Sequence, residues 1–313
     1  DNIDDGVTFA DICYASNPDY TYVPDDNFEQ ALIDLGYDDV LDDFVVTDSI
    51  SGVTELNVDS KEISDLTGIE DFIALTNLHC NNNSLTSLDV SANTALTYLW
   101  CYGNQLSSLV MSSNSALTTL YCNSNLLTSL NVSSNTALTI LHVGWNQLTS
   151  LDVSSNTALT DLHVGWNSLT SLHVSNNTLL TYLYCYGNQL TSLDVSSNTA
   201  LNNLECQNNQ LTSLDVSSNT ALTYLWCNNN QLTSLDVSAN TALTSLDCNS
   251  NQLTSLDVSS NTALTYLDCQ ENELTTLDVS ANTALTNLQC YGNQLTYLNM
   301  KNGLTDQIDE FNA

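Results

Sequence analysis

Apolar residues return at a fixed spacing of 21 residues from Leu75 onward. A typical copy, residues 222–242, reads LTYLWCNNNQLTSLDVSSNTA, and eleven copies follow one another without insertion or deletion. Within the copy, Leu occupies positions 1, 4, 11 and 14, Cys or Val occupies position 6, and position 16 is usually Val. A constant period in this range predicts a solenoid, in which each copy forms one coil that stacks on the next.

Each coil consists of two similar halves, LxxLxCxxN and LxxLxVxxN. Each half predicts a short strand followed by a turn, because side chains two residues apart in a strand point to the same face. The Leu, Cys and Val positions are therefore expected to form the core. Asn fills position 9 in every copy and position 19 in ten copies. A buried amide is costly unless it is bonded, so both Asn rows are expected to bond the backbone at the turns.

The phrase LxxLxCxxNxL resembles a leucine-rich repeat, and the doubled phrase is similar to the 21-residue bacterial repeats called the IRREKO type. The resemblance covers residues 75–305. It implies a leucine-rich repeat solenoid with a parallel sheet on its concave face and short extended segments on the other. The stretch 53–74 is interpreted as an irregular first repeat, and residues 306–313 as the start of a truncated C-terminal cap.

Residues 24–52 predict a helical N-terminal cap, preceded by an acidic segment at 1–23. In the helix expected at 24–36, Phe28, Ala31, Leu32 and Leu35 share one face, and Gly36 suits its end. This N-terminal sequence resembles the opening of secreted leucine-rich repeat proteins of the Bacteroidetes, many of which use the type IX secretion system. The resemblance implies secretion or an outer cell-surface location, contact with the cell's own secretion machinery, and a longer parent protein.

Acidic residues outnumber basic ones by 36 to 2, and the net charge is −34. The basic residues are Lys61 and Lys301. Such an imbalance argues against binding to nucleic acid or to an anionic membrane surface. No apolar run is long enough to cross a membrane, so no membrane insertion is expected.

Nine of the ten cysteines occupy position 6, where Val143 and Val164 replace them in two coils. Because Val is an apolar equivalent, the pattern predicts a ladder of buried free thiols rather than disulfides or a metal chain. Cys13 lies outside this ladder, and the sequence shows no partner for it.

Positions 3, 5, 7 and 8 are expected to point outward from the first strand of each coil, and several coils carry aromatic or histidine side chains there. These predicted ligand-binding residues are Tyr98, Trp100, Tyr102, Tyr121, His142, Trp145, His163, Trp166, Tyr182, Tyr184, Tyr186, Tyr224 and Trp226. Exposed aromatic residues favour a binding face for an extracellular protein or a polysaccharide. The other interpretation is that they only strengthen the sheet, as cross-strand aromatic pairs do. Further along, the same positions become acidic, with Glu205, Asp247, Asp268 and Glu271.

Position 15 is aspartate in most coils, and five consecutive coils carry it: Asp194, Asp215, Asp236, Asp257 and Asp278. Flanking Ser and Thr residues favour a structural role, in which local donors bond each carboxylate. Calcium along this row is the alternative, since calcium prefers oxygen ligands. The acidic run from Asp1 to Asp11 is a second calcium candidate.

His142 and His163 occupy position 5 of adjacent coils, with Asp161 nearby. Too few ligands are at hand for zinc, so stacked surface histidines are the favoured interpretation. A DSI triplet resembles the O-glycosylation motif of Bacteroidetes and makes Ser49 a candidate site.

No catalytic motif or required cofactor is predicted, and the favoured function is a surface binding or adhesion module. A passive spacer or surface stalk is the alternative. A third hypothesis is a mineral- or ice-contacting array on the Ser-x-Asp-x-Ser rows.

Overall fold

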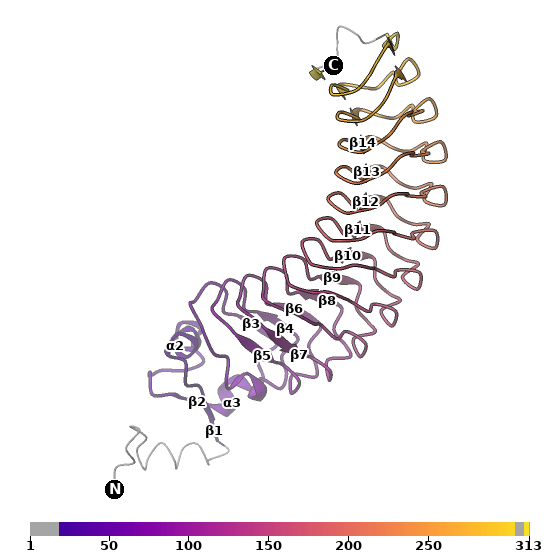
Figure 1. Ribbon diagram of the computed structural model, residues 1–313. Helices are drawn as coiled ribbons and strands as arrows, with labels where there is room; N and C mark the ends of the chain where they lie inside the picture. The colour runs from indigo at the N-terminus through magenta and orange to yellow at the C-terminus, as the bar shows by residue number, and fades with distance from the viewer. Residues whose placement is uncertain (1–18, 304–309, 313) are drawn as a thin grey trace. The chain divides into compact units, whose positions relative to one another are not determined.

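The computed structural model describes residues 19–303 and 310–312, and these fall into two compact units, Asp1–Leu138 and Thr139–Ala313. In both units, three-residue strands from successive coils pair in parallel (Figure 1). Each of these strands covers positions 3 to 5 of its coil, as the repeat pattern predicts. The fold is therefore a leucine-rich repeat solenoid with a spacing of about 21 residues.

In the first unit, equivalent leucines of successive coils lie side by side on adjacent strands, as Leu78 and Leu99 do. The parallel strands, in spatial order, are β3 (Glu55–Asn57), β4 (Asn77–His79), β6 (Tyr98–Trp100) and β8 (Thr119–Tyr121).

The second unit repeats this register, so position 3 lies beside position 3 and position 5 beside position 5 of the next coil. The parallel strands are β9 (Ile140–His142), β10 (Asp161–His163), β11 (Tyr182–Tyr184), β12 (Asn203–Glu205), β13 (Tyr224–Trp226), β14 (Ser245–Asp247), β15 (Tyr266–Asp268), β17 (Asn287–Gln289) and β19 (Glu310–Asn312). A residue on one strand is therefore flanked by the same position of the two neighbouring coils, about 4.8 Å away on each side.

The prediction of a second strand in every coil is wrong for most of the described coils. The second half pairs only at β5 (Ser87–Asp89) with β7 (Ser108–Val110), and at β16 (Thr276–Asp278) with β18 (Tyr297–Asn299). In the coils between them the second half forms no strand. Asp89 in β5 and Asp278 in β16 accept the same local backbone N–H bonds as Asp236, which lies in a coil without a second strand, so these bonds alone do not decide where the second half pairs.

The core is built from the leucine, cysteine and valine positions, whose side chains are almost completely buried. All nine described cysteines are buried and free, which confirms the predicted ladder of thiols. Burial raises the pKa of Cys101 and of Cys185 to about 12, because the apolar interior disfavours a thiolate. Cys13 and the acidic run from Asp1 to Asp11 lie outside the described residues.

The two asparagine rows bond neighbouring coils, as the burial argument predicts. At position 9, the Asn188 amide donates to the carbonyl oxygens of Val164 and Cys185, each at 3.1 Å, and its oxygen accepts the Leu169 N–H at 3.0 Å. At position 19, Asn198 donates to the carbonyls of the preceding coil. These bonds satisfy backbone groups that the turns would otherwise leave buried without partners.

The predicted helix is present as α2 (Asp26–Leu35) in the first unit. The Asp25 carboxylate accepts N–H groups of the first turn, and Gly36 ends the helix at a φ of 81°. Buried Phe28 faces Phe72, with ring centroids 6.3 Å apart. The role of this helix as a cap stays a prediction.

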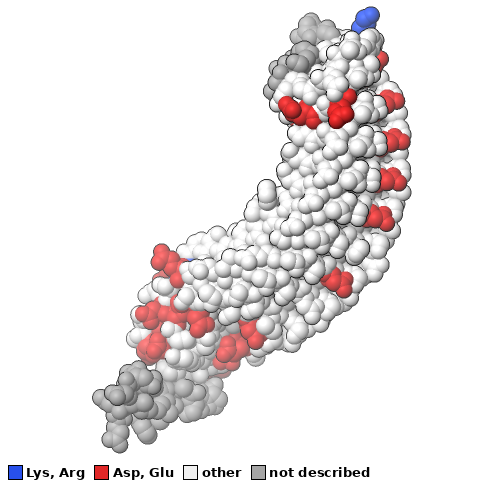
Figure 2. Space-filling model, in the orientation of Figure 1, with Lys and Arg blue, Asp and Glu red and all other residues white. Residues whose placement is uncertain are grey.

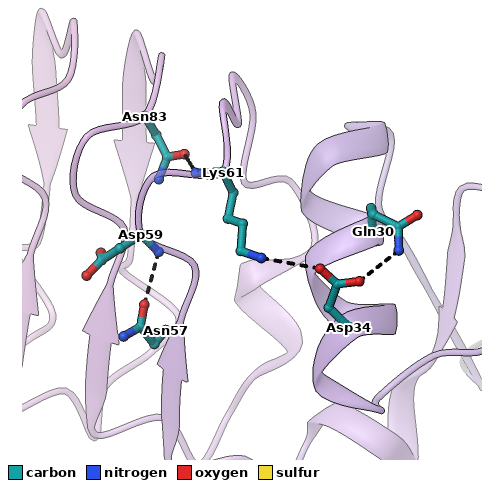
Figure 3. Close-up of polar contacts among 6 residues, drawn as sticks. All are labelled: Gln30, Asp34, Asn57, Asp59, Lys61 and Asn83. Atoms are coloured by element: carbon teal, nitrogen blue, oxygen red, sulfur yellow. Dashed lines mark hydrogen bonds and ion pairs between the residues drawn. The ribbon is translucent and has the colours of Figure 1, made fainter.

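Polar contacts also join α2 to the stretch 53–74, which is predicted to be an irregular first repeat (Figure 3). Asp34 forms an ion pair with Lys61 at 3.3 Å and accepts a hydrogen bond from the Gln30 amide. The Lys61 backbone N–H in turn donates to the Asn83 side chain, so the asparagine row of position 9 reaches the segment that the helix contacts.

The remaining elements of the first unit are short. Strand β1 (Tyr20–Tyr22) pairs antiparallel with β2 (Phe44–Val46), followed by α3 (Thr47–Ile50) and the 3-10 turn η1 (Ile69–Asp71). No helix within residues 19–303 is long and apolar enough to cross a membrane.

Candidate binding face

Position 8 of every coil adopts the left-handed backbone conformation, which glycine and asparagine tolerate best. Two coils nevertheless carry tryptophan there, Trp145 at a φ of 51° and Trp166 at 53°. The other coils use Asn82, Gly103, Ser124, Gly187, Asn208, Asn229, Ser250, Glu271 and Gly292. A bulky residue in this conformation costs on the order of 1–3 kcal/mol, which surrounding contacts must offset.

Glycines make room for the rings that surround the two tryptophans. A Cβ on Gly144 would overlap the His163 ring, and one on Gly165 would lie 2.8 Å from the Tyr186 ring. A Cβ on Gly187 would similarly lie 2.7 Å from the Trp166 indole. The repeated phrase HVGWN at 142–146 and 163–167 is the sequence signal for this packing, and the role of its glycines was not predicted.

His163 is buried, with only 8% of its surface exposed, which corrects the expectation that it points outward as a surface histidine. It stacks on Trp145, with ring centroids 5.2 Å apart at 22°, and its Nε2 lies 2.8 Å from the Tyr186 hydroxyl. Burial, followed by the nearby His142, lowers the His163 pKa to about 4. His163 is therefore neutral at neutral pH and supports the indole above it.

Tyr186 lies edge-on to both indoles, 6.1 Å from Trp145 and 6.4 Å from Trp166 between ring centroids. We call Trp145, His163, Trp166 and Tyr186 the tryptophan cluster. Its two indoles stay 47% and 49% exposed, although their neighbours are packed. The cluster thus presents two fixed aromatic side chains to solvent.

His142 contacts the edge of this cluster. Its Nε2 lies 3.1 Å from Asp161 Oδ1, and its ring centroid lies 5.4 Å from that of His163. The described residues contain no group of three or more His, Cys, Asp or Glu side chains that could hold a metal ion. His142 and Asp161 therefore form a polar pair at the edge of the cluster.

The next strands present Tyr182, Tyr184, Tyr224 and Trp226. Three of these side chains are exposed, Tyr182 by 42%, Tyr224 by 46% and Trp226 by 37%. Burial and nearby carboxylates raise the Tyr184 pKa to about 12, so this ring stays a neutral phenol. These four residues remain candidates for ligand contact.

The first unit holds a smaller group of rings. Trp100 contacts His79 and Tyr121 edge-on, with centroid distances of 4.4 and 5.6 Å. Tyr98 is 43% exposed, whereas Trp100, Tyr102 and Tyr121 are half-buried. His79 is not among the predicted contact residues, although it occupies position 5 like His142 and His163.

Toward the C-terminus, position 5 carries carboxylates on adjacent strands. Asn249 donates to Asp247 at 2.7 Å and to Asp268 at 3.2 Å, and so joins the two side chains. Burial raises the Asp247 pKa to about 6, and the neighbouring Asp268 charge adds to the rise.

The aspartates of position 15 are exposed and evenly spaced (Figure 2). Each one accepts the backbone N–H of the serine two residues later, as Asp236 does from Ser238 at 2.9 Å. The hydrogen bond from the Ser238 hydroxyl, followed by this backbone bond, lowers the pKa of Asp236. The same bonding holds for Asp194, Asp215, Asp257 and Asp278. The contacts favour the structural role, and calcium along the row stays a prediction.

Ser49 lies exposed in the short helix α3, where its hydroxyl is accessible. Its glycosylation stays a prediction.

Known proteins share both the coil and the fold. A family model described as leucine-rich repeats in two copies matches residues 220–261. The functional domain of InlJ from Listeria monocytogenes, described as including a cysteine ladder, is 38% identical, with a TM-score of 0.82. That match covers 90% of this chain and 70% of that domain. The chain belongs to the leucine-rich repeat proteins.

Two further relatives extend the comparison to the internalins. Internalin J of Listeria monocytogenes serotype 4b is 42% identical over 73 residues, which are 23% of this chain and 8% of that protein. The internalin InlF of the same species is 24% identical, with a TM-score of 0.72, over 92% of this chain and 95% of that structure. The likeness to InlF shows the fold alone. The chain is therefore internalin-like in its repeats and matches only a small part of full-length internalin J.

Proposed function

We propose that this chain is a secreted or cell-surface binding module. It holds a protein partner against the aromatic side chains at positions 3, 5, 7 and 8 of its coils. The observation that carries the proposal is the pair of exposed tryptophans in left-handed conformation. Nine other coils form the same turn with other residues, so the fold does not require tryptophan there. Strained and exposed groups cluster at ligand sites, and tryptophan is enriched at the centres of protein interfaces.

The packing beneath the indoles supports the same proposal. Gly144, Gly165 and His163 fix the rings before any partner arrives, so binding would not have to order them. The mechanism is stacking and hydrogen bonding on a preorganised surface, with no chemical step. The internalin-like repeats agree with a protein-binding role, and a surface location with contact to the secretion machinery belongs to the same proposal.

A polysaccharide is the second candidate partner, because exposed, fixed indoles also form platforms on which sugar rings stack. A passive spacer is the third, and in that case neither a protein nor a glycan would bind. The mineral- or ice-contacting array predicts function on the aspartate row instead, independent of the tryptophans.

The test is a binding screen of the native chain against extracellular proteins and against soluble and surface polysaccharides, with and without calcium, by calorimetry. The informative variant is Trp145→Asn with Trp166→Asn, because other coils place Asn at this position. We expect the affinity for a protein ligand to fall at least tenfold, while the melting temperature stays within a few degrees.

The matched control is Asp215→Asn with Asp236→Asn on the aspartate row, which should leave binding unchanged. Loss of binding in this control alone would move the site to that row. Binding of a polysaccharide only would select the second candidate, and no binding in the whole panel would favour the spacer.

A further inference from the structure

Glu205 lies between two aromatic strands of the second unit. In the parallel register, its position-5 neighbours are Tyr184 on β11 and Trp226 on β13. On the same strand, Asn203 of position 3 lies between Tyr182 and Tyr224. Side chains at positions 3 and 5 of a strand share one face. One carboxylate is therefore bordered on both sides by rings, and we call Tyr182, Tyr184, Glu205, Tyr224 and Trp226 the Glu205 box.

The rings of the box are held in place by their own contacts. Tyr182 and Tyr184 stack nearly parallel, with centroids 6.4 Å apart at 10°. The Trp226 indole donates its Nε1–H to the Ser245 hydroxyl at 3.2 Å, which fixes the orientation of the ring. Tyr182, Tyr224 and Trp226 are exposed while Glu205 is half-buried, so the rings rise around the carboxylate.

Among the residues that the structure describes, Glu205 forms no ion pair with a cationic side chain. The sequence contains no arginine, and its only lysines, Lys61 and Lys301, lie outside strands β9 to β17. Burial raises the Glu205 pKa, whereas a nearby cation would lower it. Two neutral side chains bond the carboxylate instead: the Gln207 amide donates to it at 3.5 Å, and Asn203 on the same strand also bonds it.

Side-chain amides of the same coil and the next one also leave hydrogen-bond acceptors without a donor. The side-chain oxygens of Asn203 and Gln207 are buried and accept no hydrogen bond. The same is true of the Asn228 oxygen, on the turn after β13. A group rich in N–H donors would balance such a site.

We propose that the Glu205 box binds a cationic side chain, arginine or lysine, of the protein partner. This inference rests on the proposed protein-binding function and adds the chemistry that the partner must bring. Aromatic faces attract cations through their quadrupole, and the carboxylate adds a charge-assisted hydrogen bond. The net charge of −34 attracts a basic surface toward the box from a distance.

The pattern continues over the next strand. Along position 5, β11 to β14 carry Tyr184, Glu205, Trp226 and Asp247, so rings and carboxylates alternate. The tryptophan cluster on β9 to β11 lacks this alternation, because histidines occupy its position 5. The box therefore selects charge, while the tryptophan cluster supplies apolar contact area.

The test follows the indole N–H signal of Trp226 by NMR during titration with the peptide acetyl-Gly-Arg-Gly-Arg-Gly-amide. A Trp226→Phe variant assigns the signal. The neutral control peptide carries citrulline, which keeps the shape of arginine but not its charge. We expect a saturable shift with the arginine peptide and an affinity at least fivefold weaker with the citrulline peptide.

Glu205→Gln keeps the size of the side chain and should weaken binding of the arginine peptide at least fivefold. Asp236→Asn removes the same charge from the aspartate row and should change the affinity less than twofold. Equal weakening by both variants, or equal binding of both peptides, would overturn the inference, because general charge attraction or ring stacking would then explain binding.

The failures of the two proposals are distinguishable. If a protein partner loses affinity with the Trp145 and Trp166 variant but not with Glu205→Gln, the binding function stands and the cationic contact is wrong. If the native chain binds neither a protein partner nor the arginine peptide, both proposals fail.

Discussion

Position 5 and position 15 of the second unit both carry carboxylates, but the two rows treat charge differently. Asp236 on position 15 bonds the backbone and hydroxyl of its own coil, and these bonds lower its pKa. Asp247 on position 5 is largely buried beside Asp268, and its pKa rises to about 6. At position 15 each carboxylate is bonded within its own coil, so the same residue can recur from coil to coil. At position 5 the side chains of adjacent coils interact, and the residue type varies from coil to coil.

The same contrast applies to the backbone turns. Position 8 keeps one conformation in every coil, while its side chain changes from glycine to tryptophan. The constant part is the geometry that stacking requires, and the variable part is what the surface displays. Binding is therefore to be sought where identical backbones carry different side chains, and the following variants test that distinction.

The largest effect is expected from Gly144→Ala. The new Cβ would overlap the His163 ring and lie 2.9 Å from the carbonyl oxygen of Gly165. Overpacking of this kind costs about 1–3 kcal/mol, and the free energy of unfolding by urea measures it. Gly52→Ala is the matched control, because nothing lies within 4 Å of the added atom. An equal loss of unfolding free energy in both variants would show that the His163 ring does not require the space left by the missing side chain of Gly144.

A second effect is expected from acid. The His163 pKa is lowered from 6.5 to about 4, so the folded state favours the neutral ring. This contribution to stability is complete above pH 6.5 and is lost as the pH falls through about 4. We expect the Trp145 environment to change in that window, visible as a fluorescence shift that His163→Gln removes. A shift that persists in His163→Gln would assign it to other groups.

A smaller effect is expected from Asp247→Asn, because the stability contributed by Asp247 is lost as the pH rises rather than as it falls. The raised pKa means that the stability contributed by protonated Asp247 is full below pH 3.8 and is lost as the pH rises through about 6. Removing the charge should raise the free energy of unfolding at pH 8 by about 1 kcal/mol, which a higher melting temperature would report.

The control for this variant is Asp236→Asn. Its lowered pKa means that its contribution is present above pH 3.8 and is lost on acidification, so the variant should not stabilise at pH 8. Stabilisation by both variants would indicate net-charge repulsion rather than the local burial of Asp247.

The smallest effect is expected from Cys227→Val in the core beneath both rows. Two coils already carry valine at this position, and the Cys227 side chain is fully buried among leucines. A substitution that conserves apolar character should cost less than about 1 kcal/mol, measured by urea unfolding. A larger loss would mean that the cavity at position 6 differs between coils.

Much of the fold follows from the sequence because the repeat has only one way to bury its leucines. The period, the first strand, the inward thiols and the bonded Asn188 and Asn198 all depend on contacts between identical neighbours. The helix α2 was equally accessible, since Asp25 and Gly36 mark its ends. The second strand was predicted too widely, because nearly identical half-repeats differ in pairing: Asp278 lies in β16, whereas Asp236 makes the same local bond in a coil without a second strand.

The candidate site was less accessible, because its geometry arises from residues that differ between coils. The pattern placed Trp145 and Trp166 on the surface, as found, but gave no sign that His163 lies beneath Trp145. That burial depends on Gly144, whose missing side chain leaves the space that the ring fills. The position of a residue in the repeat predicts whether its side chain points inward or outward. How deeply that side chain is buried depends on the size of the neighbouring side chains.

The thiol ladder supplies a set of chemical reporters along the stack. A buried thiol with a raised pKa reacts slowly with alkylating reagents until its coil opens, because the thiolate is the reactive form. Mass spectrometry after timed alkylation would thus give an opening rate for each coil that carries cysteine. The coils that carry Val143 and Val164 have no thiol to alkylate. In the sequence, the cysteines on either side of these two coils are Cys122 and Cys185.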